Sequence, residues 1–191
     1  MLRFKKGVCM IRLENAITNG EIGKIKTLYY EAFPKDEQKP FELISQKQAE
    51  GLVEILSIKN EENFCGLVLL AKSENLVLLD YFAIVKEFRG QKIGSEVLRI
   101  LQDRFKHEKL IIEIENPNVV CDNKPERIRR KHFYLKNGLK QVPFEVDLFG
   151  VEMEILTNNQ PLIFEEYYRV YYNVFGSIVV GNICLSSLYN Q

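Results

Sequence analysis

Apolar residues along the chain follow two spacings, and each spacing predicts one type of element. Short apolar-rich runs separated by two-residue connections favour antiparallel strands. Segments with apolar residues three or four positions apart favour helices with one buried face. The expected strands are 9–15, 52–60, 63–73, 75–85, 109–116, 139–149 and 151–157. The expected helices are 19–33, 41–50, 92–107, 125–137 and 163–176.

Proline and glycine mark where several of these helices begin and end. Pro34 stops the first helix, Gly51 follows the second, Pro125 suits a first helical turn, and Gly138 suits a helix C-terminus. Strands and helices therefore occur in mixed order, which predicts an α/β or α+β layer structure with one mixed sheet. The length of 191 residues predicts a single domain over 1–191, with a C-terminal helix and tail at 160–191.

Composition narrows the classes of function without selecting one. Lys plus Arg and Asp plus Glu each number 26, so the net charge is zero and gives no overall attraction to nucleic acid or to acidic membranes. Four separated cysteines and two histidines form no metal-ligand pattern, which predicts thiols in a reducing compartment and no metal site. The sequence shows neither a signal peptide nor an apolar run of transmembrane length, so we expect a cytoplasmic protein.

The transition from 75–85 to 92–107 is the clearest candidate binding site. The connection reads Arg-Gly-Gln-Lys-Ile-Gly-Ser at 89–95, directly before a predicted helix. Unpaired N–H groups and the helix dipole make a helix N-terminus a suitable site for phosphate. The order of residues is neither that of a P-loop nor the dinucleotide fingerprint. Taken alone, the segment is either an anion-binding loop or an ordinary turn.

Three stretches together resemble a known family. "LLDYFAIVKEFRGQKIGSEVL" resembles motif A of the GCN5-related N-acetyltransferases, the GNAT superfamily, with Arg89 and Gly94 at the first and last motif positions. "IIEIENP" and "RRKHFYLKNGLK" are similar to the family's fifth strand and its motif B. The resemblance covers about residues 9–157. Lys92 stands where a glycine is usual, so its amide points at a phosphate without strain only if φ is negative.

The resemblance implies a fold and a cofactor site. The sheet would be mixed and mostly antiparallel, flanked by helices, with a splay between its fourth and fifth strands. Acetyl-coenzyme A would lie in that gap, its pantetheine arm along the fourth strand and its pyrophosphate on the loop amides. The residues implied in cofactor binding are Phe82, Ala83, Ile84, Arg89, Gly90, Gln91, Lys92, Ile93, Gly94, Ser95 and Asn116. For Asn116, a plain role in the turn after the strand is an equal alternative.

The resemblance also suggests catalytic residues. Tyr134 is the expected general acid toward the leaving thiolate, with aromatic packing as the alternative. Glu115 ranks first as general base and Asp80 second, and Glu113 is a third candidate. Each of these carboxylates could instead be solvated or salt-bridged. The sequence therefore predicts an N-acetyltransferase acting on a small-molecule or peptide amine, or alternatively a non-catalytic coenzyme A-binding sensor or scaffold.

Three further segments each allow two interpretations. The basic stretch 125–132 could contact the 3′-phosphate of coenzyme A or form a solvated face. In 31–44, Phe33, Asp36 and Phe41 could line the acceptor pocket or belong to a plain helix-loop-helix. The apolar tail 177–191 needs a cover, supplied by its own domain or by a second subunit, so a monomer and a homodimer are both open.

Overall fold

The computed structural model describes residues 10–35 and 37–186, so Cys9, Asp36 and the end of the tail lie outside the described residues. Its strands are β1 (Ile11–Asn15), β2 (Val53–Asn60), β3 (Asn63–Ser73), β4 (Leu76–Ile84), β5 (Lys109–Glu115), β6 (Lys140–Leu148), β7 (Val151–Thr157) and β8 (Ile183–Leu185). Its helices are α1 (Asn19–Ala32), α2 (Phe41–Ala49), the short 3₁₀ helix η1 (Lys86–Phe88), α3 (Ile93–Arg104), α4 (Lys124–Lys136), α5 (Phe164–Phe175) and α6 (Ser177–Val180).

All eight of these strands form one sheet in the order β1-β2-β3-β4-β5-β7-β6-β8. Neighbouring strands are antiparallel except for β4 and β5, which are parallel and joined by α3. The mixed, mostly antiparallel sheet predicted from the sequence is therefore confirmed. None of the helices within 10–35 and 37–186 has the length and apolar character needed to cross a membrane.

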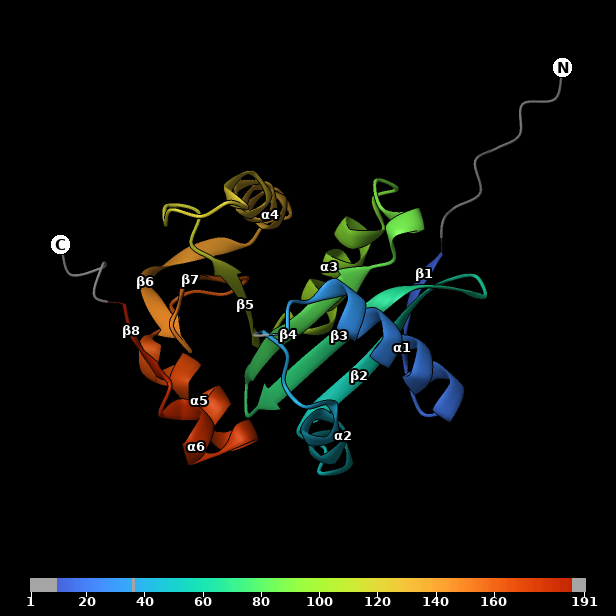
Figure 1. Cartoon of the computed structure of the whole chain (residues 1–191), viewed down its shortest axis with the longest axis horizontal. Coiled ribbons are helices and arrows are strands. Elements are labelled where there is room, and N and C mark those ends of the chain that lie inside the picture. Colours follow the sequence, from blue (N-terminus) through green and yellow to red (C-terminus); the bar gives the residue numbers. More distant parts are fainter. Residues whose placement is uncertain (1–9, 36, 187–191) are drawn as a thin grey trace, which may run out of the picture.

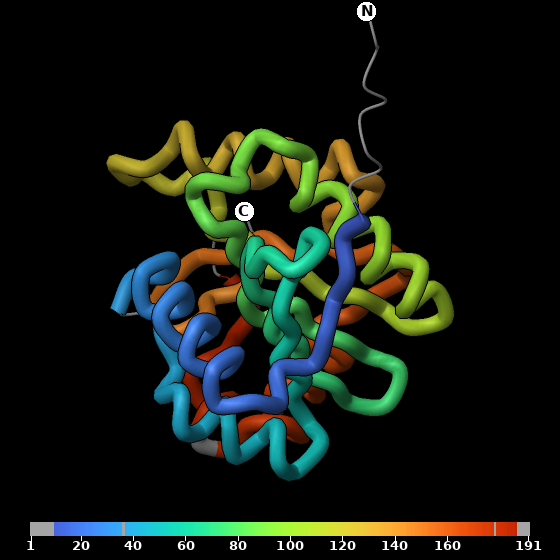
Figure 2. The backbone as a smooth tube through the Cα atoms, turned by 90° about the vertical axis from the view of Figure 1, so that its right-hand side faces the viewer, coloured from blue at the N-terminus to red at the C-terminus, as the bar shows by residue number. Residues whose placement is uncertain are grey.

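Helices cover both faces of this sheet (Figure 1). One buried cluster unites apolar residues of α1, α2, α5 and α6 with one face of the strands, and a second unites α3 and α4 with the other face. Figure 2 shows α1 and α3 on opposite sides of the strands. The alternation of side chains along each strand supplies both clusters, since successive residues point to opposite faces.

Local sequence signals fix the ends of several helices. Thr18 and Glu21 form a reciprocal capping box at the start of α1, with the Glu21 amide donating to Thr18 Oγ1 at 3.2 Å. Gly138 follows α4 with a φ of 90°, a left-handed conformation that glycine adopts without strain. These boundaries agree with the predicted ones to within a few residues.

The parallel pair β4 and β5 separates partway along its length. Residues Leu76–Leu79 pair with Lys109–Ile112, and beyond them the two strands are no longer partners. On the other edge of β4, the register with β3 shifts between Leu69 and Leu70, so that Asp80 forms a bulge. The splay implied by the family resemblance is therefore present, and a bulge stands where it begins.

The described part of the apolar tail packs on its own sheet. Residues 183–185 form β8, which pairs with Val146–Leu148 of β6, and Val180 and Ile183 are buried. The sequence analysis expected no element here, because three strand residues and four helical residues are too few to show a period. The chain's own domain therefore covers Val180 and Ile183, whereas Cys184 and Leu185 are exposed.

Candidate active site

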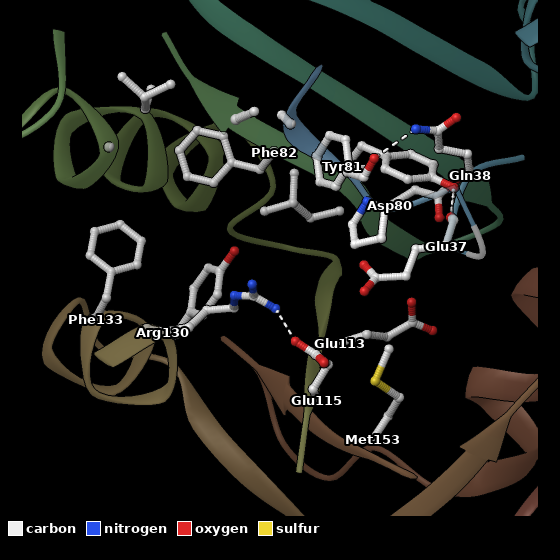
Figure 3. Close-up of a pocket in the computed structure, with 18 of the residues that line it drawn as sticks. Glu37, Gln38, Asp80, Tyr81, Phe82, Glu113, Glu115, Arg130, Phe133 and Met153 are labelled. Carbon is white, nitrogen blue, oxygen red and sulfur yellow. Dashed lines mark hydrogen bonds and ion pairs between the residues drawn. The ribbon is translucent and has the colours of Figure 1, made fainter. Parts of the chain in front are cut away.

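A cavity of about 1110 Å³ opens at the splay between β4 and β5 (Figure 3). Its walls come from the α1–α2 loop, β4, the loop leading to α3, β5, α4, the β6–β7 turn and α5. The sequence-predicted site residues that line it are Asp80, Phe82, Ala83, Ile84, Arg89, Gly90, Lys92, Ile93, Gly94, Ser95, Glu113, Glu115 and Tyr134. The fold thus brings most of the predicted residues to one cavity.

The loop before α3 presents its backbone amides to this cavity. Within the described chain, no N–H of residues 90–95 donates a hydrogen bond to another protein group. Gly90 and Lys92 both adopt positive φ, 76° and 63°, and the helix begins at Ile93. Unpaired amides beside the positive end of a helix dipole form a concave anion site.

Neighbouring side chains hold this loop in place. The Arg89 Nε donates to the Ile84 carbonyl at 2.9 Å, which ties the loop back to the end of β4. Ile93 is buried in the core under α3. A Cβ on Gly94 would lie 3.2 Å from the Phe133 ring, so glycine lets α4 approach the loop closely. The loop is therefore anchored on both sides of its free amides.

The end of β4 offers a free backbone edge to the cavity. The Val85 amide donates to the Cys65 carbonyl of the neighbouring chain segment at 2.9 Å, and Ala83 stands opposite Leu67. Because backbone groups alternate in direction along an antiparallel strand, those of Phe82 and Ile84 face the splay instead. Of these groups, the Ile84 carbonyl already accepts from Arg89 Nε, so the Phe82 groups and the Ile84 amide are the ones left for a ligand. A ligand with amide groups can add to this edge as a further strand would.

Tyr134 lines the cavity from α4, and no described residue forms a hydrogen bond with its hydroxyl. The residue is 8% exposed, and burial raises the pKa of its phenol to about 12, an effect that the nearby Arg130 guanidinium partly offsets. The phenol therefore remains protonated throughout the neutral range and can act as a hydrogen-bond donor.

Glu115 is held by two arginines of α4. Its Oε1 lies 2.6 Å from Arg127. Its Oε2 lies 2.9 Å from Arg130, a pair that Figure 3 shows. Both oxygens of this buried carboxylate are thus committed to guanidinium groups. The salt-bridged alternative therefore matches the surroundings of Glu115. The two ion pairs join α4 to β5 next to the splay.

Asp80 is also paired, with a lysine that the sequence analysis did not single out. The Lys39 Nζ lies 2.6 Å from Asp80 Oδ1, and the Asp80 side chain is only 6% exposed. The bulge in β4 directs this carboxylate toward the α1–α2 loop, as bulges near functional sites often do.

Glu113 has a different environment, made of tyrosines. Tyr167 donates to its Oε1 at 2.6 Å, and Tyr171 donates to both oxygens, at 2.8 and 3.0 Å. Burial raises the pKa of Glu113, although Lys39 and the hydrogen bonds from Tyr167 and Tyr171 oppose the rise. Burial and the charge of Glu113 likewise raise the pKa of both phenols. Among the three candidate carboxylates, Glu113 is the one without an ion pair.

Comparison with known proteins decides the family. The family described as "Acetyltransferase (GNAT) family" matches residues 22–138, which span more than half of the chain. The chain belongs to this acetyltransferase family. Acetyl-coenzyme A is the cofactor of the family, whose members are N-acetyltransferases.

Solved acetyltransferases share the fold at low sequence identity. A GNAT-family protein from Bacteroides thetaiotaomicron superposes with a TM-score of 0.72 and 17% identity, covering 87% of this chain and 99% of its own. Spermidine N-acetyltransferase from Vibrio cholerae, in complex with CoA and spermine, gives 0.59 and 13%, covering 77% and 94%. A Bacillus subtilis acetyltransferase in complex with CoA gives 0.57 and 16%, covering 80% and 100%. The search of curated sequences gives no match.

Two of the predicted cofactor residues of this acetyltransferase lie outside the cavity lining. Asn116 donates from Nδ2 to Glu145 at 2.8 Å and accepts from the Asn118 amide at 2.9 Å, an arrangement that matches the turn alternative. The Gln91 side chain donates to the Glu87 carbonyl at 3.1 Å, which leaves its backbone amide as the group available to a ligand.

Other expectations about the cavity wall are only partly met. Phe33 lines the cavity, whereas Phe41 is buried in the core, and Asp36 lies outside the described residues. Several basic side chains of α4 pair with acidic groups, and most of the stretch 125–132 is also exposed, which agrees with the solvated-face alternative. These pairs are Arg127 and Arg130 with Glu115, Arg129 with Glu126, and Lys131 with Glu154.

Sequence reasoning missed Lys39, Tyr167 and Tyr171. The two tyrosines stand four residues apart in a helix, which indicates one buried face but not the carboxylate that they contact. Lys39 carries no sequence signal beyond its place between two helices in the segment expected to form the acceptor wall.

Proposed function

We propose that this protein transfers the acetyl group of acetyl-coenzyme A directly to an amine acceptor. The observation that carries the proposal is the splay itself, which brings the end of β4, five loop residues with unpaired amides and the Tyr134 phenol around one cavity. The acceptor is a small-molecule or peptide amine entering from the side lined by the α1–α2 loop and α5. A cytoplasmic location is a further proposal, because the four cysteines are widely separated in the sequence and form no CxxC pair.

In this proposal the cofactor lies along β4. Its pantetheine amides would pair with the outward backbone groups of Phe82 and with the Ile84 amide, and its pyrophosphate would accept hydrogen bonds from the amides of Gly90–Ser95. Charge-assisted hydrogen bonds of this type each contribute about 1.5–3 kcal/mol. Lys92 adds a fixed positive charge beside the amides.

The chemistry then needs one base and one acid. The acceptor nitrogen attacks the thioester carbonyl carbon, the carbon–sulfur bond breaks, and the nitrogen loses a proton. We assign that proton to Glu113, directly or through water, because its raised pKa makes its carboxylate a stronger base than an ordinary glutamate. The Tyr134 phenol donates its proton to the leaving thiolate of coenzyme A.

The base ranked first by sequence, Glu115, receives a different role in this proposal. Both oxygens of this carboxylate already accept from guanidinium groups, so neither is placed to receive the proton of the acceptor. We therefore propose that Glu115 fixes α4, and with it Tyr134, against β5. Asp80 binds a cation, as argued below.

One specific observation favours the alternative of a coenzyme A-binding module without catalysis. Lys92 takes the left-handed conformation in the position where the family usually has glycine, and this costs a non-glycine residue about 1–2 kcal/mol. A loop that departs from the family pattern in this way would suit recognition alone. Turnover with an amine separates the two functions.

The test combines binding with transfer. Calorimetry is expected to detect binding of coenzyme A and acetyl-coenzyme A, and mass spectrometry to detect acetylated product from a panel of primary amines. Lys92→Glu should weaken binding at least about tenfold, since it reverses a charge beside the phosphates. Lys86→Glu, in η1 outside the cavity lining, is the matched control and should bind normally. Failure of the wild-type protein to bind coenzyme A would refute the proposal, and binding without any transfer would favour the alternative.

A further inference from the structure

The Lys39 ammonium group lies in a cage of aromatic rings closed by a carboxylate. Its Nζ is 5.0 Å from the ring centres of Tyr81 and Phe175, 5.5 Å from that of Tyr171, and 2.6 Å from Asp80 Oδ1. Three rings and one carboxylate around a single nitrogen form a cation-binding site, because each ring presents its negative face. Figure 3 shows Asp80 and Tyr81 on the same wall of the pocket.

The cage walls are held by contacts that do not involve the lysine side chain. The Tyr81 hydroxyl donates to the Glu37 carbonyl at 2.7 Å, and Tyr171 donates to Glu113. Phe175 packs in the core with Tyr171, and their ring centres are 5.7 Å apart. The cage therefore keeps its shape when the ammonium group leaves.

Lys39 itself is attached so that its side chain can move alone. Its carbonyl accepts from Tyr29 at 3.0 Å and its amide donates to the Tyr81 hydroxyl at 3.1 Å, which fixes the backbone. Lys39 lines both the main cavity and a second, open hollow, the latter together with Tyr30 and Gln38. A rotation of the side chain would move the ammonium group to solvent without moving the loop.

We propose that this cage binds an alkylammonium group of the acceptor and that Lys39 fills it when no acceptor is present. The lysine side chain is an unbranched four-carbon ammonium, so the cage selects ligands of that chemistry. Rings and a carboxylate stabilise the charged form of nitrogen, which is not a nucleophile. The cage therefore holds a second, non-reacting ammonium, and the acceptor is an alkyl chain that carries two amino groups. The identity of the ligand as an acceptor rests on the proposed function.

The test uses chemical rescue without cofactor, so its result does not depend on acetyl transfer. Lys39→Ala is expected to lower the Tm, and n-butylammonium chloride is expected to restore it in a saturable manner. At a hundredfold excess over Kd the rise should be roughly 5–10 °C for a chain of this length. Lys109→Ala is the matched control, since Lys109 lies 2.6 Å from Glu166 and is 19% exposed, close to the 18% of Lys39, but no ring faces it among the described residues. The control should show no rescue beyond that of sodium chloride.

A second measurement uses the wild-type protein and does not depend on the folding of a variant. Trace labelling with an amine-reactive reagent should modify Lys39 slowly, and n-butylammonium should increase the ratio of Lys39 to Lys109 labelling several-fold by expelling Lys39 from the cage. Rescue of Lys39→Ala with an increased labelling ratio would support the proposal. Equal rescue of both variants, no rescue, or an unchanged ratio would overturn it, whether or not the protein transfers acetyl groups.

Discussion

The Tyr171 hydroxyl donates to both oxygens of Glu113, at 2.8 and 3.0 Å, although the two residues lie 58 positions apart in the sequence. This pair connects the C-terminal helix to the inner end of the splay. Tyr171 also forms one wall of the cage around Lys39, so a single phenol contacts both the candidate base and the candidate cation site.

Replacement of the candidate base should mainly affect the chemical step. Glu113→Gln keeps the size of the side chain and its ability to accept from Tyr167 and Tyr171, but it cannot take a proton. We expect kcat with an amine acceptor to fall by about 10²–10⁴-fold while the Kd for acetyl-coenzyme A changes little. Steady-state kinetics and calorimetry measure the two quantities. A variant that retains near wild-type kcat would exclude Glu113 as the base.

Protonation of Glu113 should also appear in the stability of the protein. Its pKa in the folded state is raised above the usual 4.5, so between the two values the native state binds more protons than the unfolded state. The free energy of unfolding contributed by this group therefore falls as the pH rises through that interval, and is constant above the folded pKa. Denaturant unfolding from pH 4 upward should show this slope in the wild type. Glu113→Gln should show a smaller decrease of the free energy of unfolding with pH. An identical slope would contradict the raised pKa of Glu113.

Replacement of the candidate acid should leave binding intact. Tyr134→Phe removes one hydroxyl to which no described residue is hydrogen-bonded, so the fold should be retained. We expect kcat to fall by about 10²–10⁴-fold with an unchanged Kd for coenzyme A. Because the pKa of the phenol is about 12, its ionisation should not reduce the wild-type rate below about pH 10. If the wild-type rate instead fell near pH 8, and this fall were absent from Tyr134→Phe, the result would be inconsistent with this role.

The elements and the place of the loop before α3 followed from sequence because their signals are local, whereas cofactor binding by this loop stays a prediction. Helical spacing, Pro34 and Gly138 define elements within a few residues, and Arg89 and Gly94 define the loop by their separation alone. The partners of Glu113 and Asp80 could not be predicted from such local signals. Tyr171 and Lys39 reach these carboxylates through tertiary packing, and the bulge at Asp80 depends on a register that the pattern of β4 does not encode.

The two arginines that bind Glu115 should differ in their contribution to stability. Arg127 has a side chain 12% exposed and Arg130 one 45% exposed, against a carboxylate that is 8% exposed. Removing the buried partner leaves a charge largely uncompensated, so Arg127→Ala should lower the free energy of unfolding by about 3 kcal/mol. Arg130→Ala should lower it by less than about 1 kcal/mol, because solvent screens that pair. Urea unfolding compares the two variants, and a reversed order would mean that Arg130 is the main partner in solution.

The conformation of Lys92 can be tested by two variants that both remove its charge. At φ 63° and ψ 7°, a residue with a Cβ is strained, whereas glycine is not. Lys92→Gly should therefore be more stable than Lys92→Ala by about 1 kcal/mol, reduced somewhat by the greater freedom of glycine in the unfolded chain. Both should bind coenzyme A more weakly than the wild type through the loss of charge, and Lys92→Gly should bind at least as well as Lys92→Ala, because it keeps the amide direction without strain. If Lys92→Ala were instead the more stable and the tighter binder, the loop in solution would hold Lys92 at negative φ, and the amides of Gly90–Ser95 would not be arranged as an anion site.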